Sequence, residues 1–266
     1  MAEPLESLSI PELRPPNVEY EAVAPIVTKL KSQPPEPITM GEAHTLLHWT
    51  VALALQGLEN LYDSKRNWID PTHGALPDVK TRYDPTTDLY TNGDAEELYH
   101  GHPPDHWGRY ITNKCVQARD LSDAVLSELP KSMVTSIHTN AFSKINHGIL
   151  VLKLPIEEHG EVTQKHFLVD PTIAQFFYDD NTPQDDSHKV GEQLLAVNEA
   201  FARELVSQGF SELSEPNAEL YVNALGVDMK RQRAKHAMAE SKGSYLDFLQ
   251  HPEFAQARVS TQPGRF

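Results

Sequence analysis

Three short runs rich in Val, Ile, Leu, Thr and Phe follow one another between residues 132 and 170, and they constrain the fold more than any other feature. The runs cover 132–139, 146–154 and 162–170, and only short polar or proline-containing stretches separate them. Short connections of this kind join antiparallel neighbours, because parallel strands need a long crossover. The sequence therefore predicts a three-stranded antiparallel meander.

Helical patterns surround these strands on both sides. Thr39 precedes Glu42 like a capping box, and apolar residues then recur at helical spacing to about Tyr62. A second helical pattern begins at Cys115 and ends at Pro130. Further helices are predicted between residues 188 and 250. We therefore expect an α+β fold in which helices pack on an antiparallel sheet.

The N-terminal 38 residues differ in composition from the rest of the chain. They contain eight prolines, which predicts an irregular arm, and residues 64–110 are also rich in turn signals. Residues 39–266 are expected to form a single domain, with its core at 105–178 and a helical part at 188–250. The chain is long enough to bury a core of that size.

The charge of the chain excludes several kinds of partner. Lys and Arg number 23 and Asp and Glu number 38, which gives a formal net charge of −15. Such a charge repels nucleic acids and anionic membrane surfaces. The basic run 230–235 is interpreted as a solvated helix face. The acidic N-terminus and the lack of a long apolar run predict a protein without a signal peptide or membrane span, located in the cytoplasm or delivered by a route other than Sec.

Cys115 is the one cysteine of the chain, so no intramolecular disulfide can form. A thiol in the first turn of a helix is favoured as thiolate, because unpaired N–H groups and the helix dipole stabilise negative charge there. A thiolate that acts as a nucleophile also needs an imidazole, and the imidazole needs a group that fixes its orientation.

The second and third strands offer such a pair. If His147 lies directly opposite Asp170, Ile149 faces Leu168 and Val151 faces His166, and the turn centres between Glu158 and His159. This turn falls in a polar stretch, so we predict that His147 and Asp170 form the base and its orienting carboxylate. His166 is the rival base, but in this register it lies about 13 Å along the strand from Asp170.

The order of these residues resembles the catalytic core of transglutaminase-like proteins within the wider papain-like fold. The resemblance covers residues 113–176: a cysteine that opens a helix, a strand, a strand led by Asn146-His147-Gly148, and a strand that ends in Asp170-Pro171-Thr172. It implies acyl transfer or hydrolysis at a carboxamide or peptide bond of a protein or peptide substrate, without a cofactor. In this interpretation Cys115 is the nucleophile, His147 the general base and acid, and Asp170 the orienting residue.

The chain departs from the family beside the nucleophile. Asn113-Lys114 stand where transglutaminases usually have Gly-Gln, and Arg109 stands where papain-type proteases have the glutamine of the oxyanion hole. The candidates for the oxyanion donor are therefore Trp107, Asn113, Gln117 and the backbone N–H of Cys115. A papain-like cysteine protease and a non-catalytic interaction protein on the same fold are the alternatives.

A histidine-rich stretch before Cys115 suggests one more possibility. His100, His102 and His106 could supply ligands to zinc or a similar ion, although their spacing matches none of the usual zinc frameworks. We therefore expect no metal, and these histidines stay an alternative site.

Overall fold

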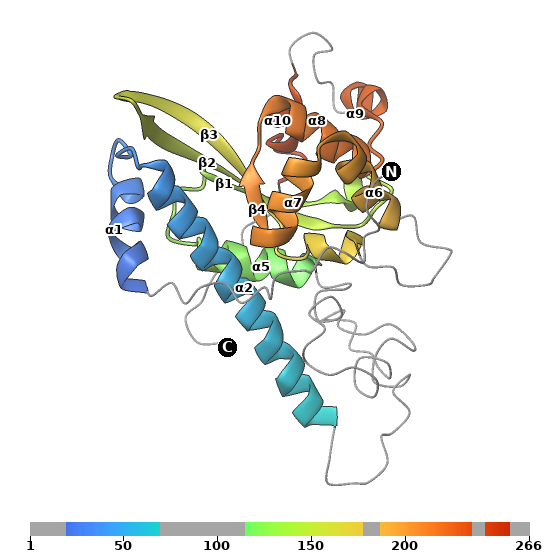
Figure 1. Cartoon of the computed structure of the whole chain (residues 1–266), viewed down its shortest axis with the longest axis horizontal. Coiled ribbons are helices and arrows are strands. Elements are labelled where there is room, and N and C mark those ends of the chain that lie inside the picture. Colours follow the sequence, from blue (N-terminus) through green and yellow to red (C-terminus); the bar gives the residue numbers. More distant parts are fainter. Residues whose placement is uncertain (1–19, 70–114, 178–186, 236–242, 256–266) are drawn as a thin grey trace.

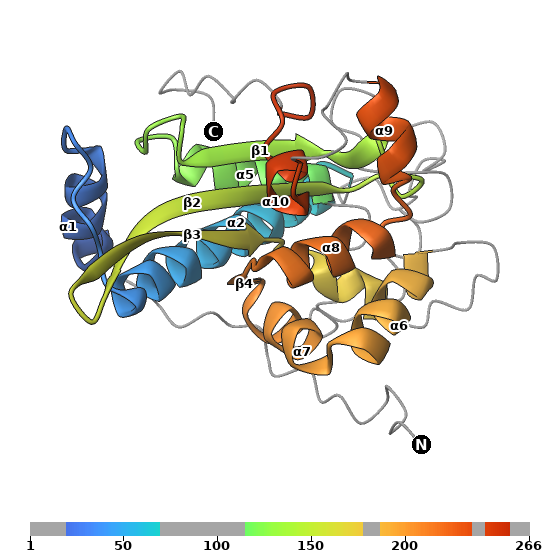
Figure 2. The same ribbon diagram turned by 90° about the horizontal axis from the view of Figure 1, so that it is seen from above.

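The computed structural model describes residues 20–69, 115–177, 187–235 and 243–255. Its centre is an antiparallel sheet in the order β1 (Val134–His138), β2 (Gly148–Glu158), β3 (Glu161–Val169) and β4 (Phe210–Glu212). Helices cover both faces of this sheet, with α2 and α5 on one side and α8 and α10 on the other (Figures 1 and 2). The expected α+β class and the three-stranded meander are confirmed.

Alternation along the strands divides the buried residues into two cores. Leu150, Leu152 and Leu154 of β2 belong to the core shared with α1, α2 and α5. Ile149 and Val151 point the opposite way, into the core shared with the C-terminal helices. Because successive side chains of a strand point to opposite faces, the sheet separates two apolar layers.

The first layer contains α1 (Tyr20–Lys31), α2 (Met40–Ile69) and α5 (Cys115–Val125). Helix α1 corrects the prediction that residues 1–38 are irregular throughout, even though Pro25 lies inside it. Four of its apolar side chains are buried in the first core: Val23, Ile26, Val27 and Leu30. The free energy gained by this burial outweighs the loss of the backbone hydrogen bond that proline cannot make. The capping box before α2 is present, with Thr39 N donating to Glu42 Oε2 at 2.8 Å and Glu42 N to Thr39 Oγ1 at 3.2 Å.

The second layer contains α6 (Ser187–Val197), α7 (Glu199–Gln208), α8 (Glu215–Ala224), α9 (Met229–Lys235) and α10 (Tyr245–Leu249). The pattern from 190 to 206 predicts one helix, but Asn198 divides it by capping α7 through its side chain, which accepts from Phe201 N. Strand β4 was not predicted, because it has only three residues between the left-handed Gly209 and the approach to α8. Short 3₁₀ helices lie at Thr139–Ala141 (η3) and Ile173–Phe177 (η4).

The hairpin of β2 and β3 has a different register from the one predicted. Val151 pairs with Leu168 and Lys153 with His166, so each β2 residue faces a β3 residue two positions further along than expected. The turn is made by His159 and Gly160, with φ angles of 54° and 81°, because a two-residue hairpin turn of this type needs positive φ at both positions. A shift of two residues keeps every side chain on its predicted face, whereas a shift of one would reverse the faces.

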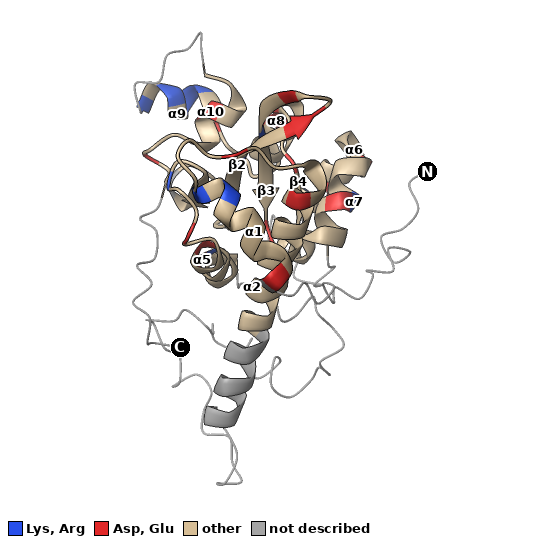
Figure 3. Ribbon diagram, turned by 90° about the vertical axis from the view of Figure 1, so that its left-hand side faces the viewer, with Lys and Arg blue, Asp and Glu red and all other residues tan. Residues whose placement is uncertain are grey.

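Charged residues are distributed unevenly over the described surface. Basic side chains mark α9, where Lys230, Arg231 and Lys235 are exposed, as expected for a solvated face (Figure 3). Within the described residues, no helix combines the length and the apolar character that crossing a membrane requires.

Candidate active site

His147 lies immediately before β2, and Thr139 holds its backbone from both sides. His147 N donates to Thr139 Oγ1 at 2.8 Å, and Thr139 N donates to His147 O at 2.7 Å. Both residues are fully buried. The ring of His147 also packs on Phe176, with ring centroids 4.7 Å apart. These contacts fix the direction in which the imidazole leaves the backbone.

Asp170 follows β3 directly and contacts His147 from the neighbouring strand. His147 Nε2 and Asp170 Oδ2 are 2.7 Å apart, and both side chains are buried. In the observed register Asp170 lies diagonally across from His147 on the same face, and an imidazole and a carboxylate can span that separation. The predicted pair is therefore in contact although the predicted register is wrong.

The Asp170 carboxylate accepts three further hydrogen bonds. Thr172 donates its backbone N–H and its hydroxyl to Oδ1, each at 3.2 Å. Tyr221 of α8 donates its hydroxyl to Oδ2 at 2.9 Å. A buried carboxylate needs such donors, because burial without them is costly.

Cys115 is the first residue of α5 and reaches the site past Gly148. A Cβ atom on Gly148 would lie 2.7 Å from the Cys115 carbonyl oxygen and 3.0 Å from Val116 Cα. Only glycine allows the start of α5 to approach β2 so closely. The Cys115 thiol lies 3.9 Å from the carbonyl oxygen of Asn146, and the residue is 8% exposed.

Electrostatics favour the charged forms of both Cys115 and His147. Burial is the strongest single influence on the thiol and favours its neutral form, but the His147 charge, the His147 side chain and the Gly148 backbone N–H together lower the pKa of Cys115 below its ordinary 9.0. Burial likewise opposes charge on His147, yet Asp170 and Cys115 raise the pKa of His147 to about 10. The surroundings of the two side chains therefore favour a thiolate beside an imidazolium.

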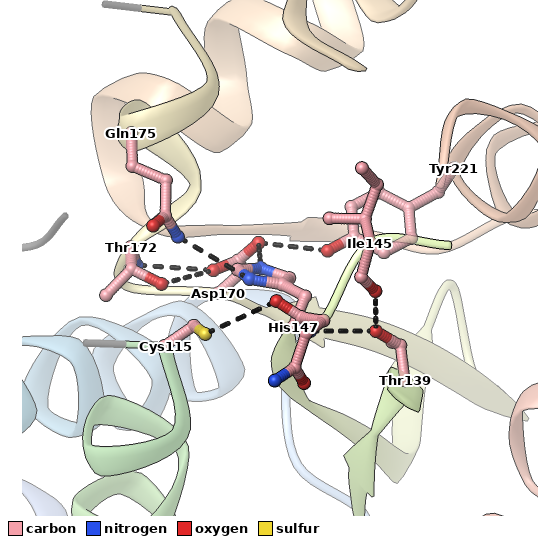
Figure 4. Close-up of polar contacts among 9 residues, drawn as sticks. Cys115, Thr139, Ile145, His147, Asp170, Thr172, Gln175 and Tyr221 are labelled. Carbon is pink, nitrogen blue, oxygen red and sulfur yellow. Dashed lines mark hydrogen bonds and ion pairs between the residues drawn. The ribbon is translucent and has the colours of Figure 1, made fainter. Parts of the chain in front are cut away.

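Gln175 of η4 adds an amide beside this pair. Its Nε2 atom is 3.5 Å from His147 Nδ1, the ring nitrogen that is not bonded to Asp170. Figure 4 shows Cys115, Thr172 and Gln175 on one side of the His147–Asp170 pair and Tyr221 on the other. Donors at Thr172, Gln175 and Tyr221 thus surround the three predicted residues.

Of the remaining candidates, Gln117 alone belongs to the described residues. Trp107, Asn113, His100, His102 and His106 lie outside the described residues, so their predicted roles stay predictions. Gln117 follows Cys115 by two positions in α5, which turns its side chain about 200° around the helix axis from the thiol. In the part of the chain that the structure describes, no group of three or more His, Cys, Asp and Glu residues could hold a metal ion.

Two other histidines lie near the sheet but belong to different surroundings. His166 is half-buried, and burial and the charge of Lys153 lower its pKa, while a hydrogen bond with Gln250 opposes them. His138 ends β1, where burial and the charge of Arg119 lower its pKa. Within the described part of the chain, neither histidine has a carboxylate contact like that of His147 with Asp170.

The sequence did not single out Gln175 or Tyr221. Gln175 stands five residues after Asp170, and a short 3₁₀ helix brings it back over the site. Tyr221 lies in the helical C-terminal part, on the helix that covers the His147 face of the sheet. The one signal that could have found Tyr221 is its hydroxyl within an otherwise apolar helix face, since a buried phenol seeks a polar partner.

Comparison of the chain with models of protein families, with curated proteins and with solved structures gave no match.

Proposed function

We propose that this protein is a thiol-dependent enzyme that transfers or hydrolyses the acyl group of a carboxamide or peptide bond. The observation that carries the proposal is the buried contact of His147 with Asp170, in a site where the pKa of Cys115 is lowered and that of His147 is raised. Such opposite shifts in a nucleophile and its base are characteristic of catalytic sites.

In the proposed reaction the Cys115 thiolate attacks the carbonyl carbon and forms a C–S bond. The His147 imidazolium then gives its proton to the leaving nitrogen as the C–N bond breaks, so that ammonia or an amine departs and a thioester stays on Cys115. Water or an amine attacks the thioester, His147 takes up its proton, and the thiolate is regenerated. Asp170 keeps the imidazole oriented throughout.

Two groups from the described segments are donors for the negative charge that develops on the carbonyl oxygen. The backbone N–H of Cys115 belongs to the first turn of α5 and has no partner within that helix. The Gln175 amide lies beside His147 Nδ1, on the same side of the imidazole as the sulfur (Figure 4). We assign the oxyanion role to these two groups, in place of Gln117.

The chain order of the site supports a transglutaminase-like arrangement. The nucleophile opens a helix, the histidine precedes β2, and the aspartate follows β3, as the resemblance implies. Deamidation and transamidation are therefore the favoured reactions. The papain-like protease and the non-catalytic protein are the other outcomes of the test below.

The test combines thiol labelling with acyl transfer. Wild-type protein and Cys115→Ala are incubated with iodoacetamide near neutral pH, and separately with glutamine-containing proteins, and intact masses are measured. We expect rapid alkylation of the wild type and loss of ammonia from the substrate, whereas peptide fragments would indicate a protease. A thiol that reacts no faster than free cysteine, with no change in the substrate, would show that the site is not catalytic.

A further inference from the structure

Tyr221 reaches the proposed catalytic centre from the helical layer that the sequence analysis did not connect with catalysis. Its hydroxyl donates to Asp170 Oδ2 at 2.9 Å, the same oxygen that lies 2.7 Å from His147 Nε2. The whole residue is buried. The phenol is therefore committed to one carboxylate oxygen and has no contact with solvent.

The hydroxyl acts as a donor under all ordinary conditions. Burial, and next the charge of Asp170, raise the pKa of Tyr221 well above its ordinary value, so the phenol keeps its proton. Together with Thr172 on Oδ1, it provides donors to both carboxylate oxygens. Donors on both oxygens fix the plane of the carboxylate and thus the direction in which Oδ2 faces His147.

The same helical segment also contacts the loop that carries His147. Ser143 donates its hydroxyl to the Leu225 carbonyl oxygen directly after α8. Gln232 of α9 donates its side-chain amide to the Phe142 carbonyl oxygen at 3.4 Å. The segment from Tyr221 to Gln232 therefore contacts both connections, the one that delivers Asp170 and the one that delivers His147.

A role for Tyr221 in proton transfer to the substrate does not fit this geometry. Asp170 lies between its hydroxyl and the imidazole, and the sulfur lies on the opposite side of the pair (Figure 4). Tyr221 can act on the reaction only through Asp170 and His147.

We propose that Tyr221 is a positioning residue that holds the Asp170 carboxylate in the orientation in which Oδ2 faces His147 Nε2. This inference rests on the proposed function. It makes α8 part of the catalytic unit rather than a separate binding surface. The charge of Asp170 acts on the pKa of each of its ionisable neighbours Cys115, His147 and Tyr221.

The test compares Tyr221→Phe with Tyr245→Phe. The first variant removes only the hydroxyl, and the second removes a hydroxyl from the same layer whose hydrogen bonds are with Glu219 and Asn223. The rate of Cys115 alkylation by iodoacetamide is followed against pH, and kcat and KM are measured for acetyl transfer from p-nitrophenyl acetate.

For Tyr221→Phe we expect the acidic limb of the alkylation profile to move to higher pH by about one pH unit. The reason is that an Asp170 carboxylate that is no longer held in place supports the His147 imidazolium less well, and the imidazolium in turn stabilises the Cys115 thiolate less well. We expect kcat for acetyl transfer to fall about 10- to 100-fold with little change in KM. Tyr245→Phe should behave like the wild type. A Tyr221→Phe protein with the wild-type pH profile and kcat would overturn the inference.

Thr172→Val keeps the inference testable if Tyr221→Phe does not fold. It removes a hydroxyl donor from the other oxygen of Asp170, and we expect a change of the same sign. An unchanged profile would contradict the positioning role of these donors. Failure of the proposed function would look different, since the wild type itself would then show neither acetyl transfer nor a reactive thiol.

Discussion

Replacement of Asp170 by asparagine is the sharpest test of the proposed centre, because the change is nearly isosteric and yet turns an NH₂ group toward donors on one side or the other. The carboxylate accepts from His147 and Tyr221 on Oδ2 and from Thr172 twice on Oδ1. An asparagine has one oxygen, so its NH₂ group must face donors in either orientation. If the NH₂ group faces His147, Nε2 becomes the acceptor and the proton moves to Nδ1, which can then no longer take a proton from Cys115.

The size of the effect follows from the His147 pKa. Its rise from 6.5 to about 10 corresponds to a net preference for the imidazolium of about 5 kcal/mol, because the attraction of its neighbours, Asp170 the strongest, outweighs the opposing effect of burial. Without the Asp170 charge, the strongest influence that favours the imidazolium is lost, and burial, which favours the neutral imidazole, is opposed by Cys115 alone. We expect acyl transfer to fall about 10³- to 10⁴-fold, as in other triads that lose their orienting carboxylate. The unpaired donors should lower the free energy of unfolding by about 1–3 kcal/mol.

The assay measures kcat for acetyl transfer from p-nitrophenyl acetate and urea unfolding for Asp170→Asn, with Asp228→Asn as the control. Asp228 is exposed and accepts a hydrogen bond from Arg231 N, so the same chemical change there should affect neither quantity strongly. An Asp170→Asn protein with wild-type turnover would refute the assignment of Asp170 as the orienting residue.

Three other changes test separate parts of the site. Gln175→Ala should leave the rate of Cys115 alkylation unchanged but lower kcat for acetyl transfer about 10²- to 10³-fold, since alkylation forms no oxyanion. Equal losses in both assays would instead assign Gln175 to the positioning of His147. Gly148→Ala should lower the free energy of unfolding in urea by about 1–3 kcal/mol and slow the alkylation of Cys115, because the new Cβ would lie 2.7 Å from the Cys115 carbonyl oxygen. The control Gly41→Ala should do neither, since its Cβ would lie 3.9 Å from the nearest atom. Alkylation of wild-type Cys115 should titrate with a midpoint below the ordinary thiol pKa of 9.0. In His147→Ala the midpoint should rise to 9.0 or above, because burial favours the neutral thiol. An unchanged midpoint would show that His147 does not ionise Cys115.

The fold was predictable where local patterns and tertiary packing agree. The three strand runs and the capping box at Thr39 are examples, and both are present. Helix α1 was missed because proline counts describe local preference, while the burial of residues such as Leu30 depends on the rest of the core. Strand β4 was missed because three residues carry almost no periodic signal.

The contact of His147 with Asp170 was predictable for a reason other than the one first given. The predicted register was wrong by two residues, but the alternation of side chains is preserved by an even shift. Gln175 and Tyr221 could not be found in this way, because their positions depend on how η4 and α8 fold over the sheet. A contact between two side chains of one hairpin can be predicted from their spacing in the sequence, whereas a contact with a residue from a separate layer cannot.

The division of the centre among three layers has a consequence for how the protein matures. Cys115 comes from the layer of α1, α2 and α5, His147 and Asp170 from the ends of the sheet strands, and Tyr221 from the layer synthesised last. While the chain leaves the ribosome, the sulfur is exposed before its partners exist, and it then has the chemistry of an ordinary thiol. The complete arrangement, Tyr221 included, forms only once α8 packs on the sheet, so on the proposed function the layer synthesised last brings the site to full activity.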